Sequence, residues 1–213
     1  MNKDKIKKLL KSRVLSVAAS FCFAVYNGYL WFAKGYVFGG CICIYYFLLT
    51  LIRAAVIVLK SGEDKKGIPH ARAGLSAALF LLNFALAAPV ALMVFGKRSY
   101  ELGLIPAITM ATYATYKITI AIIRYKKFDK YGLPAVMRSA DLTDALVSVL
   151  TLQNALIIAT EGSAGGSMKT LTAYTSGAIF ALITAISAIT FIRAIKYRKA
   201  IKNSVAPQAD IKE

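Results

Sequence analysis

Six long apolar stretches place the strongest constraint on how this chain can fold. They cover residues 14–31, 37–59, 73–95, 102–123, 142–159 and 171–192. Each is close to the ~20 residues that an α-helix needs to cross the hydrocarbon layer of a bilayer. Because lipid offers backbone N–H and C=O groups no hydrogen-bond partners, each stretch is predicted to be helical. With 58% hydrophobic residues, the sequence predicts an all-α, polytopic membrane protein with six transmembrane helices.

The distribution of lysine and arginine along the chain predicts its topology. Of the 27 Lys and Arg residues, 21 lie in the N-terminal tail, in the loops after the second and fourth stretches, and in the C-terminal tail. Four fall on the opposite side, while Arg53 and Lys117 fall inside apolar stretches. Since cytoplasmic loops carry the excess of cations, both termini are expected in the cytoplasm of a multi-pass cell-membrane protein. The predicted organisation is a basic tail at 1–13, a six-helix transmembrane domain at 14–193 and a second tail at 194–213.

The formal net charge of +17 raises the question of nucleic-acid binding, since a basic patch is the usual footprint of phosphate recognition. Here the cations, Arg72 and Arg138 among them, are spread over four short segments at the ends of the stretches. In that position cations fix the orientation of the helices and contact anionic headgroups. The expected partners are therefore the lipid bilayer and anionic lipid headgroups at its cytoplasmic face, and no nucleic acid.

The sequence contains no pattern typical of a metal, cofactor or catalytic site. Cys22, Cys41 and Cys43 lie within or beside apolar stretches and are predicted to pack as small side chains. His70 falls in a loop without Cys or a carboxylate at ligand spacing. The common hydrolase and nucleotide-binding motifs are absent. We therefore expect no metal, no cofactor and no enzymatic activity.

The even-numbered stretches end in a common phrase, an apolar pair followed by arginine. It occurs at Arg53, Arg124 and Arg193, which are 71 and 69 residues apart. Each odd-numbered stretch contains one asparagine, and these are Asn27, Asn83 and Asn154. Two interpretations stay open: three tandem helical hairpins of common origin, or unrelated helices that end in a cation and use one asparagine to bind a neighbouring helix.

Ionisable residues at membrane depth are functional candidates, because a bilayer makes their burial costly. Lys117 lies in a hydroxyl-rich tract, 109–117, about two turns before Arg124. This tract is predicted to line a polar seam inside the helix bundle. The alternative is that the Lys117 stem extends along the helix to the interface, roughly 10 Å away.

Two carboxylates and one arginine have two interpretations each. Asp141 and Asp144 lie three residues apart on one helix face, so they either cap the fifth helix or pair with Lys117 or Arg53. Arg53 either lies inside the membrane opposite a partner, or marks the point at which the second helix leaves the membrane. The repeated arginine phrase favours the second position for Arg53.

Segment 35–53, with a Lys-Gly entry and a Gly-Gly centre, resembles the first two helices of the cation diffusion facilitator transporters. Segment 139–148 resembles the start of their fifth helix, and the six helices and cytoplasmic termini also match. The resemblance implies metal ligands four residues apart on the second and fifth helices. In this chain the four positions hold Leu49, Arg53, Ala140 and Asp144, of which only Asp144 is a metal-binding type. A zinc exporter is therefore not expected.

A second resemblance concerns segment 146–153, Leu-Val-Ser-Val-Leu-Thr-Leu-Gln. It is similar to a phrase in small six-helix bacterial membrane proteins that have no assigned activity. This resemblance implies the six-helix fold and no function.

Two functional interpretations follow. The first is a secondary transporter or permeation protein for a small solute or ion, in which the excess of cations at membrane depth favours an anionic or neutral solute. The alternative is a non-transporting scaffold or accessory subunit whose amides hold the bundle together. The Gly35-x-x-x-Gly39 motif permits a homodimer through close helix contact. The residues predicted to form the polar seam are Asn27, Arg53, Asn83, Tyr113, Tyr116, Lys117, Asp144, Gln153 and Asn154.

Overall fold

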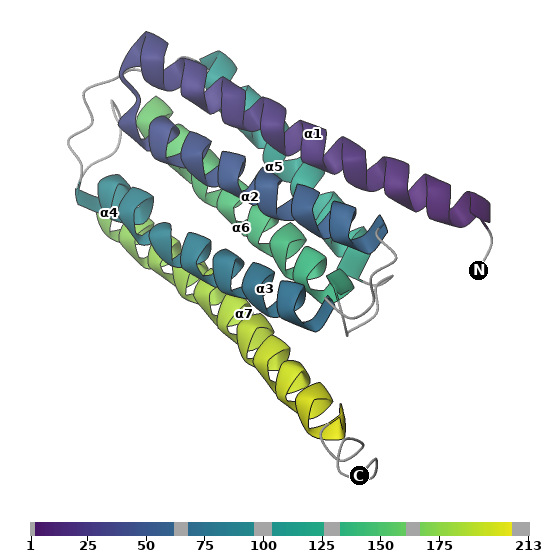
Figure 1. Ribbon diagram of the computed structural model, residues 1–213. Coiled ribbons are helices and arrows are strands. Elements are labelled where there is room, and N and C mark those ends of the chain that lie inside the picture. Colours follow the sequence, from purple (N-terminus) through teal and green to yellow (C-terminus); the bar gives the residue numbers. More distant parts are fainter. Residues whose placement is uncertain (1–2, 62–67, 96–103, 126–132, 161–166, 206–213) are drawn as a thin grey trace, which may run out of the picture.

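The computed structural model describes residues 3–61, 68–95, 104–125, 133–160 and 167–205, and all of these except Gly35, Tyr36 and Leu86 are helical. Helices α3 and α4 follow one another directly and together make one pass, so the described chain passes six times along the bundle (Figure 1). The prediction of an all-α chain with six helices is confirmed. The helices are α1 (Lys3–Lys34), α2 (Val37–Ser61), α3 (Ile68–Ala85), α4 (Ala87–Phe95), α5 (Leu104–Tyr125), α6 (Leu133–Thr160) and α7 (Ser167–Val205).

Five of the six passes are long and apolar enough to cross a membrane. The protein is therefore an integral membrane protein. In Figure 1, α1 begins and α7 ends at the same end of the bundle. The five spans are Val14–Lys34, Val37–Leu59, His70–Leu92, Pro134–Ile158 and Ala173–Arg198.

The sixth pass, α5, is more polar, but its exposed threonines have no free hydroxyl groups. Each of these hydroxyls donates to the carbonyl oxygen four residues earlier in the same helix, at 2.8 to 3.0 Å. Such bonds satisfy a hydroxyl without any partner from outside the helix. The threonines therefore do not line a polar seam, contrary to the expectation for tract 109–117, and instead lie on the outer surface of the bundle. They are Thr109, Thr112, Thr115 and Thr119.

The helices extend beyond the predicted apolar stretches. The basic segments at both ends of the chain continue α1 and α7, while residues 206–213 lie outside the described residues. Helix α6 begins at Leu133, well before residue 142. Arg72 and Arg138, predicted to lie in loops, are part of α3 and α6, and Arg72 is buried. The loop prediction for these two arginines is therefore wrong.

The break between α3 and α4 follows from Pro89. Proline has no N–H to donate to the carbonyl of Ala85, and its ring crowds that carbonyl. The backbone bends at Leu86, whose N–H bonds to the Asn83 carbonyl at 3.2 Å in a tight turn. Helix α4 then resumes, with the N–H of Val90 bonded to the Leu86 carbonyl at 3.1 Å.

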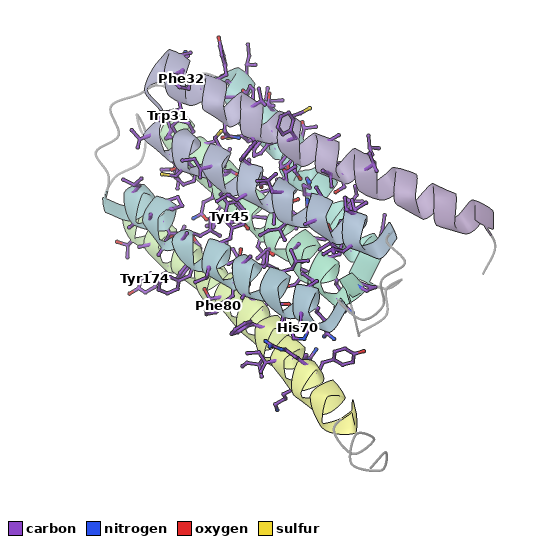
Figure 2. All side chains as sticks on the ribbon, viewed as in Figure 1. Trp31, Phe32, Tyr45, His70, Phe80 and Tyr174 are labelled. Carbon is purple, nitrogen blue, oxygen red and sulfur yellow. The ribbon has the colours of Figure 1, made fainter. Side chains whose placement is uncertain are left out.

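The passes pack most closely in three pairs, α1 with α2, α3 with α7, and α5 with α6. Helices α2 and α6 contact one another and join the first and third pairs into a four-helix group of α1, α2, α5 and α6. The α3–α7 pair packs against this group, with α3 on α2 and α7 on α6 (Figure 1). Phe80, labelled in Figure 2, stacks on Phe191 across the α3–α7 contact, with ring centroids 5.8 Å apart. Of the three predicted hairpins, that of α1 and α2 is closely packed, whereas the main partners of α3 and α5 are α7 and α6.

Glycines allow α1 and α2 to approach one another closely. Gly35 forms the turn between them with φ of 64°, a conformation that side chains disfavour. A Cβ at Gly40 would lie 2.7 Å from the Trp31 ring (labelled in Figure 2), and one at Gly39 would lie 3.1 Å from the Asn27 carbonyl oxygen. These glycines are used within one chain, and the homodimer stays a prediction.

Candidate functional site

Three helices bring ionisable side chains together inside the bundle, and a fourth adds a serine. Arg53 comes from α2, Lys117 from α5, and Asp141 and Asp144 from α6, while Ser20 of α1 lies among them. All five side chains are buried, with exposed fractions between 0 and 5%. We call these five residues the charge cluster.

Asp144 is the centre of the charge cluster. Its Oδ2 lies 2.6 Å from Arg53 Nη1 and 2.6 Å from Lys117 Nζ. The second terminal nitrogen of Arg53, Nη2, donates to Asp141 Oδ1 at 2.9 Å and to the Ala140 carbonyl at 3.0 Å. Arg53 thus bridges two carboxylates from adjacent turns of α6, a task for which the planar guanidinium is suited.

Ser20 connects the two cations to α1. Its Oγ accepts hydrogen bonds from Arg53 Nη1 at 2.8 Å and from Lys117 Nζ at 2.6 Å. The Ser20 hydroxyl has acceptors of its own in the Ser16 carbonyl at 3.1 Å and Asp144 Oδ2 at 3.3 Å. The hydroxyl therefore joins a helix without a buried charge of its own to the charged part of the bundle.

Aromatic side chains cover the charge cluster. Tyr113 stacks on Phe23 with ring centroids 3.8 Å apart, and Tyr46 contacts both rings edge-on. The Tyr113 hydroxyl reaches Asp144 Oδ1 at 3.5 Å, and the Tyr46 hydroxyl donates to the Asp144 carbonyl at 3.4 Å. Lys117 Nζ also lies 5.1 Å from the centre of the Tyr113 ring, within the range of a cation–π contact.

The four ionised side chains balance one another, with two cations and two anions. Moving a single charge from water into the interior costs several kcal/mol, and close pairing offsets this cost only when the geometry is good. Replacing a buried ion pair by apolar residues is often neutral or stabilising. Stability alone therefore gives no strong reason for the chain to hold four charges at this depth.

The structure decides between the alternatives left open by the sequence. Lys117 is buried and paired and does not reach the interface. Asp141 and Asp144 lie two or more turns inside α6 and pair with Arg53, so the capping interpretation is wrong. Arg53 lies inside its span and faces partners, because α2 continues to Ser61. The exit point favoured by the arginine repeat is therefore wrong for Arg53.

The remaining residues predicted for the polar seam lie elsewhere. The Tyr45 hydroxyl, labelled in Figure 2, donates to Asn83 Oδ1 at 2.9 Å, and Asn83 Nδ2 bonds to Ser187 Oγ of α7. Asn154 donates to the Tyr36 hydroxyl at 2.6 Å. Gln153 bonds to Thr175, Asn27 donates to the Phe23 carbonyl of its own helix at 2.8 Å, and Tyr116 is half-buried outside the charge cluster. Of the nine predicted residues, the structure brings together Arg53, Tyr113, Lys117 and Asp144.

Replacing Asn83 by leucine is expected to lower the free energy of unfolding by about 1–2 kcal/mol. The substitution removes two interhelical bonds, each worth roughly 0.6 kcal/mol on average and up to about 1.7 kcal/mol. Asn27→Leu is the matched control, because the side chain of Asn27 donates to the Phe23 carbonyl within α1. Thermal unfolding in detergent measures both variants. An equal loss for the two would contradict a role of Asn83 in joining α2, α3 and α7.

Comparisons with protein-family models, with curated proteins and with solved structures match no family, no curated protein and no solved structure to this chain.

Proposed function

We propose that the protein is a secondary transporter whose pathway runs through the four-helix group α1, α2, α5 and α6, and that the charge cluster closes this pathway. The observation that carries the proposal is the buried contact of Lys117 and Arg53 with Asp144. An ionisable side chain at membrane depth is a functional candidate by default, because such residues mark solute and ion pathways. The cluster joins side chains from all four helices of the group, so a rearrangement of any one helix changes its contacts.

The proposed cargo is a small neutral or anionic solute. The charge cluster balances two cations with two carboxylates, so it offers a passing metal cation no net negative charge. The departure of this chain from the metal-ligand pattern of the cation diffusion facilitators supports the same choice of cargo. The positions that this pattern implies for metal ligands include Arg53, whose guanidinium is paired with Asp144, and two apolar side chains, Leu49 and Ala140. Such a set offers a divalent metal too few donors.

Accessibility of a single cysteine tests the proposal without knowledge of the solute. Ala140 is buried beside the charge cluster, since its carbonyl accepts a hydrogen bond from Arg53. The Ala140→Cys variant is made with Cys22, Cys41 and Cys43 replaced by alanine, and sealed vesicles are treated with a membrane-impermeant maleimide from either side. We expect labelling from both sides, because a transporter opens its pathway to each side in turn.

The matched control is Ser187→Cys, which is equally buried but lies on α7 outside the four-helix group. We expect this variant to stay protected on both sides. If the Ala140→Cys variant is folded and is protected from labelling as completely as the control, the proposal of a transporter is contradicted.

A specific observation favours a non-transporting scaffold as the second candidate. Every ionised side chain of the charge cluster is paired. Two surface clefts found among the described residues, one between α3, α6 and α7 and one along α2, α3 and α4, are lined by other residues. In a scaffold the cluster fixes which helices pair, a specificity role that single buried polar groups play in some bundles. Lasting protection of the Ala140→Cys variant supports this candidate.

A further inference from the structure

A cleft of about 360 Å³ opens between α3, α6 and α7, apart from the charge cluster. This volume falls within the range of small-molecule sites, roughly 300–1,000 Å³. Three arginines line it, Arg72 of α3, Arg138 of α6 and Arg193 of α7, together with Ser139, Thr190 and an apolar wall that includes Leu142. The lining contains no acidic residue, so the cleft gathers positive charge.

The burial of Arg72 is the least expected feature of the cleft, because an arginine side chain is here only 2% exposed. Within the described part of the chain, its Nε and Nη1 are buried and have no hydrogen-bond partner. The Tyr197 ring lies over the guanidinium, 4.7 Å from its carbon, and contacts one face without using the N–H groups. An uncompensated buried guanidinium is costly, and because Arg72 is part of the cleft lining, an anion in the cleft would supply the partner that it lacks.

Ser139 adds a second unpartnered group to the same cleft. Its side chain is 4% exposed, and its hydroxyl has no hydrogen-bond partner among the described residues. One hydroxyl and the N–H groups of a guanidinium form the set of donors that proteins use for phosphate oxygens. Arg138 and Arg193 supply additional positive charge at the rim.

The cleft lies near the ends of three membrane spans, which is a depth at which phosphate groups occur. Arg72 lies in the first turn of the span His70–Leu92, Arg138 lies one turn into the span Pro134–Ile158, and Arg193 lies close to the end of the span Ala173–Arg198. Span ends lie at the depth of lipid headgroups. A phosphate at that depth has access to the cleft either as part of a lipid or from solution.

We propose that this cleft is a binding site for a phosphate group, with Arg72 as its main charged partner and Ser139 as a neutral donor. The group belongs either to the headgroup of an anionic phospholipid or to free phosphate. The site is independent of the proposed transport, because it shares no side chain with the charge cluster.

Binding to the purified full-length chain tests the site with two probes. Inorganic phosphate is titrated in detergent, and nanodiscs of phosphatidylcholine with increasing phosphatidylglycerol serve as the lipid probe; thermal stabilisation and native mass spectrometry are the readouts. Arg72→Gln is expected to weaken binding of whichever probe binds the wild-type chain, by roughly tenfold or more, because a charge-assisted hydrogen bond is lost. Arg193→Gln, at an exposed position that folding tolerates, is expected to weaken it severalfold.

The matched control is Lys196→Gln, an exposed cation on α7 outside the cleft lining, with an expected change below twofold. If inorganic phosphate binds the wild-type chain and Arg72→Gln abolishes that binding, the cleft is a site for free phosphate. Binding of phosphatidylglycerol alone, lost in the same variant, identifies a lipid site. The proposal is overturned if neither probe stabilises the wild-type chain, or if Arg72→Gln and Arg193→Gln bind as well as Lys196→Gln. Because none of these variants alters the charge cluster, their failure leaves the labelling of Ala140→Cys unaffected.

Discussion

Replacing Asp144 by asparagine is expected to destabilise the protein by about 3–5 kcal/mol, the usual cost of removing one partner from a buried ion pair. Asp144 Oδ2 lies 2.6 Å from both Arg53 and Lys117. Arg53 keeps a carboxylate in Asp141. Lys117 keeps only the Ser20 hydroxyl and the Ser16 carbonyl as polar partners in the described structure, so its charge is left without a counterion.

The double variant Lys117→Met/Asp144→Asn is expected to recover most of that loss. It removes one cation and one anion, and the remaining pair, Arg53 with Asp141, is balanced. A double-mutant cycle built from thermal unfolding in nanodiscs gives the coupling free energy between the two residues. Thr109→Val controls for loss of a polar group on the exposed face of α5. A double variant whose loss equals the sum of the losses of Lys117→Met and Asp144→Asn would show that the two residues are not coupled.

Replacing Gly39 by valine is expected to destabilise the protein by about 1–3 kcal/mol through overpacking. A Cβ at this position overlaps the Tyr36 ring and lies 3.1 Å from the Asn27 carbonyl oxygen of α1. The Tyr36 hydroxyl accepts a hydrogen bond from Asn154 at 2.6 Å, so moving the ring aside also breaks its contact with α6.

Gly74→Ala is the matched control for Gly39. Gly74 lies in α3, and a Cβ there meets no other atom within 4 Å. Alanine at such a helical position is expected to stabilise by roughly 0.5–1 kcal/mol, because glycine loses more backbone freedom on folding. Melting temperatures of the two variants should therefore move in opposite directions. A melting temperature of Gly39→Val at or above that of the wild-type chain would contradict close α1–α2 packing at Gly39.

Hydropathy made the number and type of helices predictable, because each residue adds its transfer free energy to a span almost independently of the others. The same reasoning singled out Arg53, Lys117 and Asp144, since a charge inside an apolar stretch needs a partner wherever the helices pack. The sequence thus identified these three residues but left open whether they pair, and their contacts at 2.6 Å follow from the packing of the helices.

The rest of the charge cluster depends on packing, which the sequence does not show. Ser20 is one of several serines in the chain, and only the approach of α1 to α2 and α5 gives it two cationic donors. Arg72 looked like a loop cation because it precedes the apolar stretch, and its burial follows from the early start of α3 and the contact with α7. Asp141 looked like a cap because the start of α6 at Leu133 lies outside the apolar stretch.

The helices that carry the cations of the charge cluster are synthesised before the helix that carries its carboxylates. Both cations, Arg53 and Lys117, belong to helices made before α6, which supplies both carboxylates. Each cation therefore enters the bilayer without its counterion, at a cost of about 2.5–3.5 kcal/mol on insertion scales. Arrival of α6 neutralises both at once. The last helix but one thus acts as the closing element of the four-helix group, and a nascent chain that stops short of Asp141 has two uncompensated charges in lipid.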